Sequence, residues 1–284
     1  MNQETEVITS RANPKVKTIV RLAQHKQRRN SGLFVIESMR DLDRAITVGL
    51  KVREIYICPD VFGQTLEQLR SLMDVEVGES IRWFEVNDSV LEKMTYRENP
   101  EGIVAVLEQN KLDLANMSKG KAKAGKDELW AVTVGMEKPG NVGAIARTLG
   151  AAGGTGMLLA DAKTDAMNPN AIRASTGAVF DIPCIETTSQ DAIDFLQKRG
   201  VKFIVADPNA DKPYTDADLT GPVAVVLGAE DSGVPQIWKF ASKSKTKGQM
   251  VSIPMKKGVV DSLNASISAA VVIYEAMRQR AAKK

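Results

Sequence analysis

Short apolar runs alternate with helix-length segments along the second half of the chain. The runs read LWAVTVGM, TGMLLAD, FDIPCIE, KFIVAD, PVAVVLG and MVSIPM. Continuous apolar runs of about four to eight residues are typical of strands buried on both faces, as in parallel sheets with helices on either side. The pattern therefore predicts a doubly wound, mostly parallel α/β domain over residues 129–284.

The first part of the chain also alternates between helical and strand patterns. The apolar runs LFVIES, VREIYIC, RWFEV and GIVAVLE predict strands, and residues 13–25, 39–48 and 66–73 have helical patterns. These elements predict a small α/β domain over residues 1–107. Residues 108–128 lack aromatic side chains and are rich in lysine, glycine and alanine, so we expect a linker there.

The segment Ser262–Arg280 is apolar almost all round. A helix with this pattern is expected to bury two faces. One face can pack on the sheet, which leaves the other for a partner subunit or for the first domain. We therefore expect a homodimer.

Charge is distributed unevenly, although the net charge is only +3. Residues 8–31 carry seven Lys or Arg side chains and no acid, and a second acid-free run spans Lys239–Lys257. Two basic runs in one chain favour a polyanionic partner such as RNA. The candidate RNA-binding residues are Arg11, Lys15, Lys17, Arg28 and Arg29.

Cysteine and histidine are scarce. Cys58 and Cys184 form no CxxC pair, and His25 is the single histidine. This composition disfavours disulfide frameworks, structural zinc sites and histidine-based catalysis, so we expect no metal. The amino terminus does not resemble a secretory signal, and no apolar run is long enough to span a membrane. We therefore expect a cytoplasmic protein without a membrane partner.

The glycine-rich turn after LWAVTVGM is the first candidate for ligand binding. Gly140 and Gly143 are three residues apart, which fits neither GxGxxG nor GxxxxGK[ST]. Asp161, about 20 residues after the turn, stands where a dinucleotide fold places its ribose acid. A Rossmann-type oxidoreductase thus stays open as an alternative, although no acid suited to hydride transfer accompanies it.

Three motifs of the second half resemble a known family. PGNVGAIARTLGAAG at 139–153, VVLGAEDSGVP at 225–235 and SIPMKKGVVDSLNASISAAVVIYEA at 252–276 are similar to the three motifs of SpoU-type RNA 2′-O-ribose methyltransferases of the SPOUT superfamily. SRANPKVK, LFVIES and ENPEGIVAV resemble the L30e-like substrate-binding domain that many members carry. The resemblance covers nearly the whole chain, with Ala229 and Ala265 as small departures.

The resemblance implies a carboxyl-terminal trefoil knot over residues 129–284 that binds S-adenosyl-L-methionine. Gly228 allows a close backbone approach, and Ile253 and Met255 offer an apolar wall for adenine. By resemblance, the cofactor-binding residues are Leu227, Gly228, Glu230, Ile253, Met255, Ser262, Leu263 and Asn264.

Arg147 occupies the position of the family's catalytic arginine. A guanidinium stays protonated, so we expect it to clamp phosphate and polarise the ribose hydroxyl rather than to remove a proton. We expect Asn141 and Glu230 to hold Arg147, and Ser262 and Asn264 to complete the hydrogen bonds around the hydroxyl and the methionine. Without the family, Ser262 would be interpreted as a helix cap and Asn264 as a first-turn residue.

The sequence thus predicts an S-adenosylmethionine-dependent 2′-O-ribose methyltransferase of structured RNA. Ribosomal RNA is the preferred substrate because the L30e-like domain resembles a module that recognises structured RNA. Two alternatives remain: a transfer RNA methyltransferase, and a non-catalytic RNA-binding or ribosome-assembly protein of the same fold.

Overall fold

The computed structural model describes residues 6–72, 81–117, 125, 127–243, 248–256 and 258–283. The chain forms two compact units. Unit 1 comprises Met1–Lys111 and Met167–Arg173, and unit 2 comprises Leu112–Ala166 and Ala174–Lys284. Within the stretch predicted as a linker, Glu108 completes a strand and Leu114–Met117 form a short helix. Residues 118–124 and 126 of that stretch lie outside the described residues.

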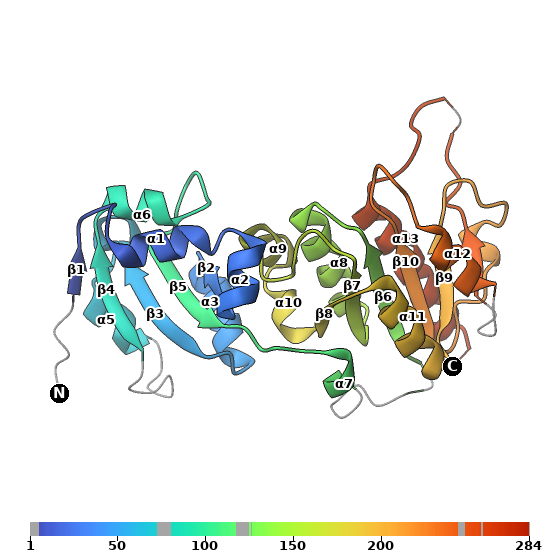
Figure 1. The fold of residues 1–284 in the computed structure, drawn as a ribbon, viewed down its shortest axis with the longest axis horizontal. Coiled ribbons are helices and arrows are strands. Elements are labelled where there is room, and N and C mark those ends of the chain that lie inside the picture. Colours follow the sequence, from blue (N-terminus) through green and yellow to red (C-terminus); the bar gives the residue numbers. More distant parts are fainter. Residues whose placement is uncertain are drawn as a thin grey trace. The chain divides into compact units, whose positions relative to one another are not determined.

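Unit 1 has a mixed five-stranded sheet in the order β1-β4-β3-β5-β2 (Figure 1). Strands β1, β4 and β3 run parallel, whereas β5 is antiparallel to both β3 and β2. The strands are β1 (Glu6–Ile8), β2 (Leu33–Ile36), β3 (Val52–Ile57), β4 (Arg82–Val86) and β5 (Ile103–Glu108). The helices are α1 (Pro14–Arg21), α2 (His25–Ser31), α3 (Met39–Thr47), α4 (Pro59–Phe62), α5 (Leu66–Leu72) and α6 (Asp88–Met94).

Helix α1 shows how local sequence positions the basic segment of unit 1. Asn13 caps the helix by accepting a hydrogen bond from the backbone N–H of Lys15 at 2.9 Å, and Pro14 occupies the first turn. Val16 and Ile19 are spaced three residues apart and are both buried against the unit 1 core. Burial of this stripe leaves the opposite side of α1 to its charged residues.

Unit 2 has a six-stranded sheet in the order β11-β9-β10-β6-β7-β8, and every pairing is parallel. The predicted mostly parallel α/β domain is therefore confirmed. The strands are β6 (Leu129–Val134), β7 (Gly156–Ala160), β8 (Cys184–Thr187), β9 (Lys202–Ala206), β10 (Val223–Leu227) and β11 (Gln249–Val251). The helices are α7 (Leu114–Met117), α8 (Pro139–Ala151), α10 (Ala178–Asp181), α11 (Ser189–Lys198), α12 (Gln236–Ser242) and α13 (Ala265–Ala281), with a 3-10 turn η1 (Tyr214–Asp216). Helix α9 (Pro169–Ser175) belongs to both units, because residues 169–173 are part of unit 1 and residues 174 and 175 are part of unit 2.

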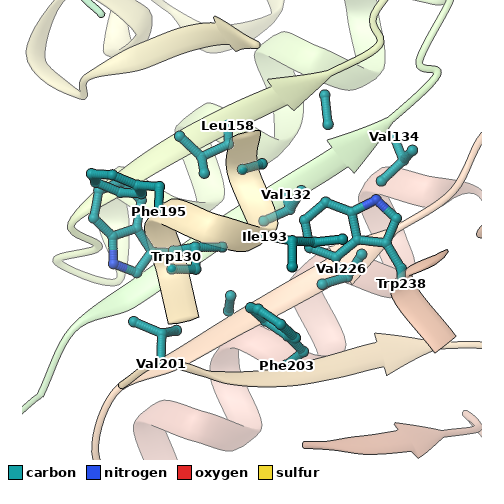
Figure 2. Close-up of a cluster of buried hydrophobic side chains, with 14 of the residues drawn as sticks. Trp130, Val132, Val134, Leu158, Ile193, Phe195, Val201, Phe203, Val226 and Trp238 are labelled. Atoms are coloured by element: carbon teal, nitrogen blue, oxygen red, sulfur yellow. The ribbon is translucent and has the colours of Figure 1, made fainter. Parts of the chain in front are cut away.

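Helices cover both faces of the unit 2 sheet, with α11 and α12 on one face and α8 and α13 on the other (Figure 1). The core under α11 and α12 is rich in aromatic residues (Figure 2). Trp130 packs edge-on against Phe195, and Phe203 packs edge-on against Trp238. The indole N–H of Trp238 donates to the hydroxyl of Ser189 at 2.9 Å, so its polar atom is satisfied although the side chain is fully buried.

Helix α13 differs from its prediction at the amino end. It starts at Ala265, three residues after Ser262, and Asn264 is its cap because its side chain accepts from the backbone N–H of Ser266 at 2.9 Å. At the other end, the Arg280 guanidinium donates to the carbonyls of Glu128 and Gly221. These bonds tie α13 to the sheet.

A second difference concerns FDIPCIE, predicted as one strand. Phe180 and Asp181 end helix α10, and strand β8 starts only at Cys184. Pro183, which lies between them, has no backbone N–H for a ladder and marks the boundary. No helix of the described residues is long and apolar enough to cross a membrane.

Candidate active site

A cavity of about 260 Å³ lies in unit 2 at the carboxyl ends of β9, β10 and β11. Open parallel sheets bind ligands at this edge, because the loops that follow the strands converge there. The cavity unites the second and third motifs with the loop after β9. The predicted residues that line it are Leu227, Gly228, Glu230, Ile253, Met255, Ser262 and Leu263.

The eighth predicted cofactor residue, Asn264, joins a hydrogen-bond network beside the cavity. Its side-chain N–H donates to Oδ1 of Asn141 at 3.1 Å and to Oε1 of Glu230 at 3.2 Å. The Asn141 amide donates to the same Glu230 oxygen at 2.8 Å. One residue from each of the three sequence motifs therefore meets at this point.

Lys138 completes this network, and the sequence analysis missed it. Its ammonium forms an ion pair with Oε2 of Glu230. Hydrogen bonds from Lys138 and Asn141, together with the charge of Lys138, lower the pKa of Glu230 below its ordinary value. Glu230 is thus held as a carboxylate. The position of Lys138, directly before the Pro139 that opens α8, was the one available sequence signal.

The structure does not bring Arg147 into contact with Asn141 or Glu230, so that expectation is wrong for this chain. Arg147 lies six positions after Asn141 on α8, which turns Arg147 by about 240° around the helix axis relative to Asn141. Asn141 is buried, whereas Arg147 is exposed and makes no hydrogen bond or ion pair to another residue that the structure describes. Its guanidinium is therefore available to a partner outside this chain.

The role of Gly228 also differs from its prediction. A Cβ built at Gly228 would lie 2.1 Å from the carbonyl carbon of Gly233 and 2.4 Å from the backbone nitrogen of Val234. Real Cβ atoms do not approach backbone atoms this closely. Glycine is required here because the loop after β10 folds back on its own backbone, and not only because a ligand approaches.

The basic segment of unit 1 needs one correction. Arg11, Lys17 and Arg29 are exposed, and the half-buried Lys15 places its ammonium 4.5 Å from the centre of the Phe84 ring. Arg28, however, is only 1% exposed and donates to the carbonyl of Leu22 at 2.7 Å. Arg28 is therefore structural and is removed from the candidate RNA-binding residues.

The second basic run is described only in part. Lys239 of α12 pairs with Asp207 at 2.6 Å and is not a free surface charge. Lys245, Lys247 and Lys257 lie outside the described residues.

Asp161 has a structural role that removes the support for a dinucleotide site. Its carboxylate accepts from the backbone N–H of Ser189 at 3.2 Å, at the amino end of α11. The described part of the chain contains no cluster of three or more His, Cys, Asp or Glu side chains that could hold a metal ion.

Comparison with known proteins identifies the family. A model of the SpoU rRNA Methylase family matches residues 128–274, more than half of the 284 residues. The chain belongs to the SpoU rRNA methylase family. This membership confirms the predicted class of enzyme, a methyltransferase. A model of the MRM3-like substrate binding domain matches residues 13–105 of this SpoU-family chain.

Several relatives are similar over almost the full length. The chain is 28% identical to a 23S rRNA (uridine(2479)-2′-O)-methyltransferase of Streptomyces viridochromogenes, over 91% of this chain and 87% of the relative. It is 27% identical to the 23S rRNA (guanosine(2553)-2′-O)-methyltransferase RlmP of Bacillus subtilis, over 94% of this chain and 97% of the relative. The crystal structure of an AdoMet-bound rRNA methyltransferase from Sinorhizobium meliloti matches with a TM-score of 0.82 at 28% identity, over 97% of this chain and 98% of that chain.

Proposed function

We propose that this SpoU-family enzyme transfers the methyl group of S-adenosylmethionine to the 2′-hydroxyl of a ribose in ribosomal RNA. The observation that carries the proposal is the meeting of Asn141, Glu230 and Asn264 in one network beside the cavity. The names of the Streptomyces and Bacillus relatives, both 23S rRNA 2′-O-methyltransferases, support ribosomal RNA over transfer RNA.

The lining of the cavity fits an adenosine-containing cofactor. Leu227, Ile253, Met255 and Leu263 offer an apolar slot for a flat base, and Glu230 and nearby polar groups suit the charged amino-acid end. When bound, S-adenosylmethionine supplies an electrophilic methyl group on a sulfonium and a neutral sulfide as leaving group. The chain itself must therefore position the hydroxyl and hold the RNA.

Arg147 is suited to holding the RNA at the reacting ribose. Its exposed guanidinium, free of partners within the described residues, can grip a backbone phosphate with two parallel N–H donors and polarise the adjacent 2′-hydroxyl. The network around Glu230 stabilises the cofactor cavity. It joins the first turn of α8 to the start of α13, and so keeps the geometry of the cavity constant.

Incubation with radiolabelled S-adenosylmethionine and deproteinised RNA tests the function directly. We expect label in 23S ribosomal RNA, in a dinucleotide that resists alkaline hydrolysis because its 2′-hydroxyl is blocked. Label only in transfer RNA would establish the alternative substrate. Cofactor binding without transfer to any cellular RNA would favour the non-catalytic RNA-binding or ribosome-assembly protein.

Cofactor binding is expected to need no metal, because apolar walls and glycine loops line the cavity and no ligand cluster is found among the described residues. Calorimetric titration with S-adenosylhomocysteine should give the same affinity with and without EDTA. NAD, titrated in parallel, should not bind. Affinity that disappears in EDTA and returns with a divalent ion would contradict this prediction.

The basic patch, defined here as Arg11, Lys15, Lys17 and Arg29, is proposed to bind RNA phosphates. Replacing Arg11, Lys17 and Arg29 by glutamine should weaken RNA binding and flatten the plot of log affinity against log salt by about 2–3 in slope, since each phosphate contact contributes about 0.7–0.9. S-adenosylhomocysteine affinity should stay unchanged.

A charge-matched control comes from the same unit. Arg40, Lys51 and Arg53 are exposed and lie near carboxylates, Asp41 for the first and Glu108 for the other two. The triple glutamine variant of these residues should leave the salt slope unchanged. Equal slopes for the patch variant and the wild type would make the patch an ordinary solvated face.

We also propose a homodimer that uses α13. Ile267, Tyr274 and Met277 are 53%, 51% and 37% exposed, while other apolar residues of the same helix are buried. Burial of this face could contribute roughly 25 cal/mol per Å² of apolar area before the entropy of association is subtracted. A second subunit could also place RNA held by one chain at the cofactor of the other.

Sedimentation velocity tests the dimer. The wild type should sediment as a dimer, and a variant with Ile267→Glu and Met277→Glu should sediment as a folded monomer. An active wild-type monomer at assay concentration would refute the proposal. The trefoil knot, which sheet order alone does not establish, and the cytoplasmic location stay predictions.

A further inference from the structure

An ion pair lines the cavity at a position that none of the three motifs includes. Asp207 follows β9 directly, is 8% exposed and lines the cavity together with Lys239 of α12. The ammonium of Lys239 lies 2.6 Å from Oδ2 of Asp207, and Oδ1 accepts from the backbone N–H of Asn209 at 2.9 Å. The carboxylate is thus fixed in orientation through both of its oxygens.

Asp207 is ionised despite its burial. Burial alone raises the pKa of this carboxyl group, but the hydrogen bonds from Lys239 and Asn209 and the charge of Lys239 outweigh it, and the pKa lies below its ordinary value. An ionised carboxylate only accepts hydrogen bonds. Its ligand must therefore present donors.

The acceptor capacity of the two cavity carboxylates differs. Oε1 of Glu230 already accepts from Asn141 and Asn264, and Oε2 pairs with Lys138. Among the residues that the structure describes, each oxygen of Asp207 has one partner and so retains capacity for another donor. Two adjacent oxygens that each accept one further bond match a pair of neighbouring hydroxyl groups.

The charge of Lys239 selects between the donors of S-adenosylmethionine. A second ammonium beside Asp207 would meet the like charge of Lys239, which already balances the carboxylate. A neutral diol meets no such repulsion. The adenine amine is a single neutral group, and its ring is accounted for by the apolar slot that includes Leu227, Ile253 and Met255.

We infer that Asp207, oriented by Lys239, accepts hydrogen bonds from the 2′- and 3′-hydroxyls of the cofactor's ribose. Asp207 is then the residue by which this chain selects a ribonucleoside over a deoxyribonucleoside in its cavity. The inference rests on the proposed function, because it takes the adenosine moiety of S-adenosylmethionine as the occupant.

The test compares ligands as well as variants. S-adenosylhomocysteine, its 2′,3′-dideoxy analogue and its analogue without the α-amino group are titrated calorimetrically into the full-length wild type and Asp207→Asn. The wild type should bind the dideoxy analogue about 10- to 100-fold more weakly than S-adenosylhomocysteine, since hydrogen bonds to a charged group are lost. In Asp207→Asn this ratio should fall to within about threefold, while the ratio for the desamino analogue stays at its wild-type value.

A matched control is Asp218→Asn. Asp218 pairs with Lys202 at 2.8 Å in the same unit but does not line the cavity, so its loss should leave all three affinities unchanged. If Asp207→Asn does not fold, Asp207→Glu, which moves the carboxylate by one methylene group, should also reduce the ratio of affinities for S-adenosylhomocysteine and the dideoxy analogue.

The outcomes separate this inference from the proposed function. Wild-type protein that binds no S-adenosylhomocysteine refutes the proposed function itself. If the wild type binds S-adenosylhomocysteine, but the ratio of its affinities for S-adenosylhomocysteine and the dideoxy analogue is the same in the wild type and in the Asp207 variant, only the role of Asp207 is refuted. If Asp207→Asn instead lowers the ratio of affinities for S-adenosylhomocysteine and the desamino analogue, Asp207 binds the ammonium of the cofactor, which likewise overturns the inference.

Discussion

Arg147→Ala is expected to lower the single-turnover rate of methyl transfer by about 10²–10³-fold, the usual effect of removing one preorganised charged donor from a reacting centre. The affinity for S-adenosylhomocysteine and the melting temperature should change little, because Arg147 is exposed and does not line the cavity. Rapid-quench measurement with saturating RNA and labelled cofactor isolates the chemical step from RNA binding and product release.

Arg147→Lys separates shape from charge. Lysine keeps the positive charge but not the planar fork of donors, so we expect most of the activity to be lost in this variant as well. Lys198→Ala is a matched control, because Lys198 is also an exposed helical cation of unit 2. Near-normal single-turnover rates in both Arg147 variants would remove this residue from the mechanism.

The resemblance to the SpoU motifs named the residues that line the cavity, and the parallel sheet explains why they lie together. Leu227 ends β10, and Ile253 and Met255 follow β11 closely, so a parallel sheet brings them to one edge whatever the exact loop paths are. Asn141, Glu230 and Asn264 could be assigned to one site through the three motifs, although the bonds between them could not be predicted. Such bonds join residues 34 to 123 positions apart and depend on loop conformation.

The features that sequence did not predict are charged side chains whose partners are distant or lie in the backbone. Arg28 has the same local composition as Arg29, yet its guanidinium turns inward to the carbonyl of Leu22. Lys239 belongs to a basic run but is neutralised by Asp207, 32 positions earlier. A run of charge fixes the composition of a segment but not which of its side chains face solvent.

Gly228 shows the same limit for backbone geometry. The motif marked a position that needs glycine, but not the atoms that require it. A Cβ at position 228 would lie 2.1 Å from the carbonyl carbon of Gly233. This carbon is a backbone atom, so it cannot rotate away as a side chain would. Gly228→Ala must therefore displace the loop 228–234, which also carries Glu230.

We expect this displacement to cost about 1–3 kcal/mol of stability, as overpacking does elsewhere, and to weaken S-adenosylhomocysteine binding by about 5- to 150-fold if the same strain falls on the bound conformation. Thermal unfolding and calorimetry measure the two effects. Gly140→Ala is the control: a Cβ there meets nothing within 4 Å, and helix α8 favours alanine over glycine, so stability should be unchanged or slightly higher. Wild-type stability and affinity in Gly228→Ala would mean that the loop after β10 can move away from β10 without cost, and that the network around Glu230 does not hold it in place.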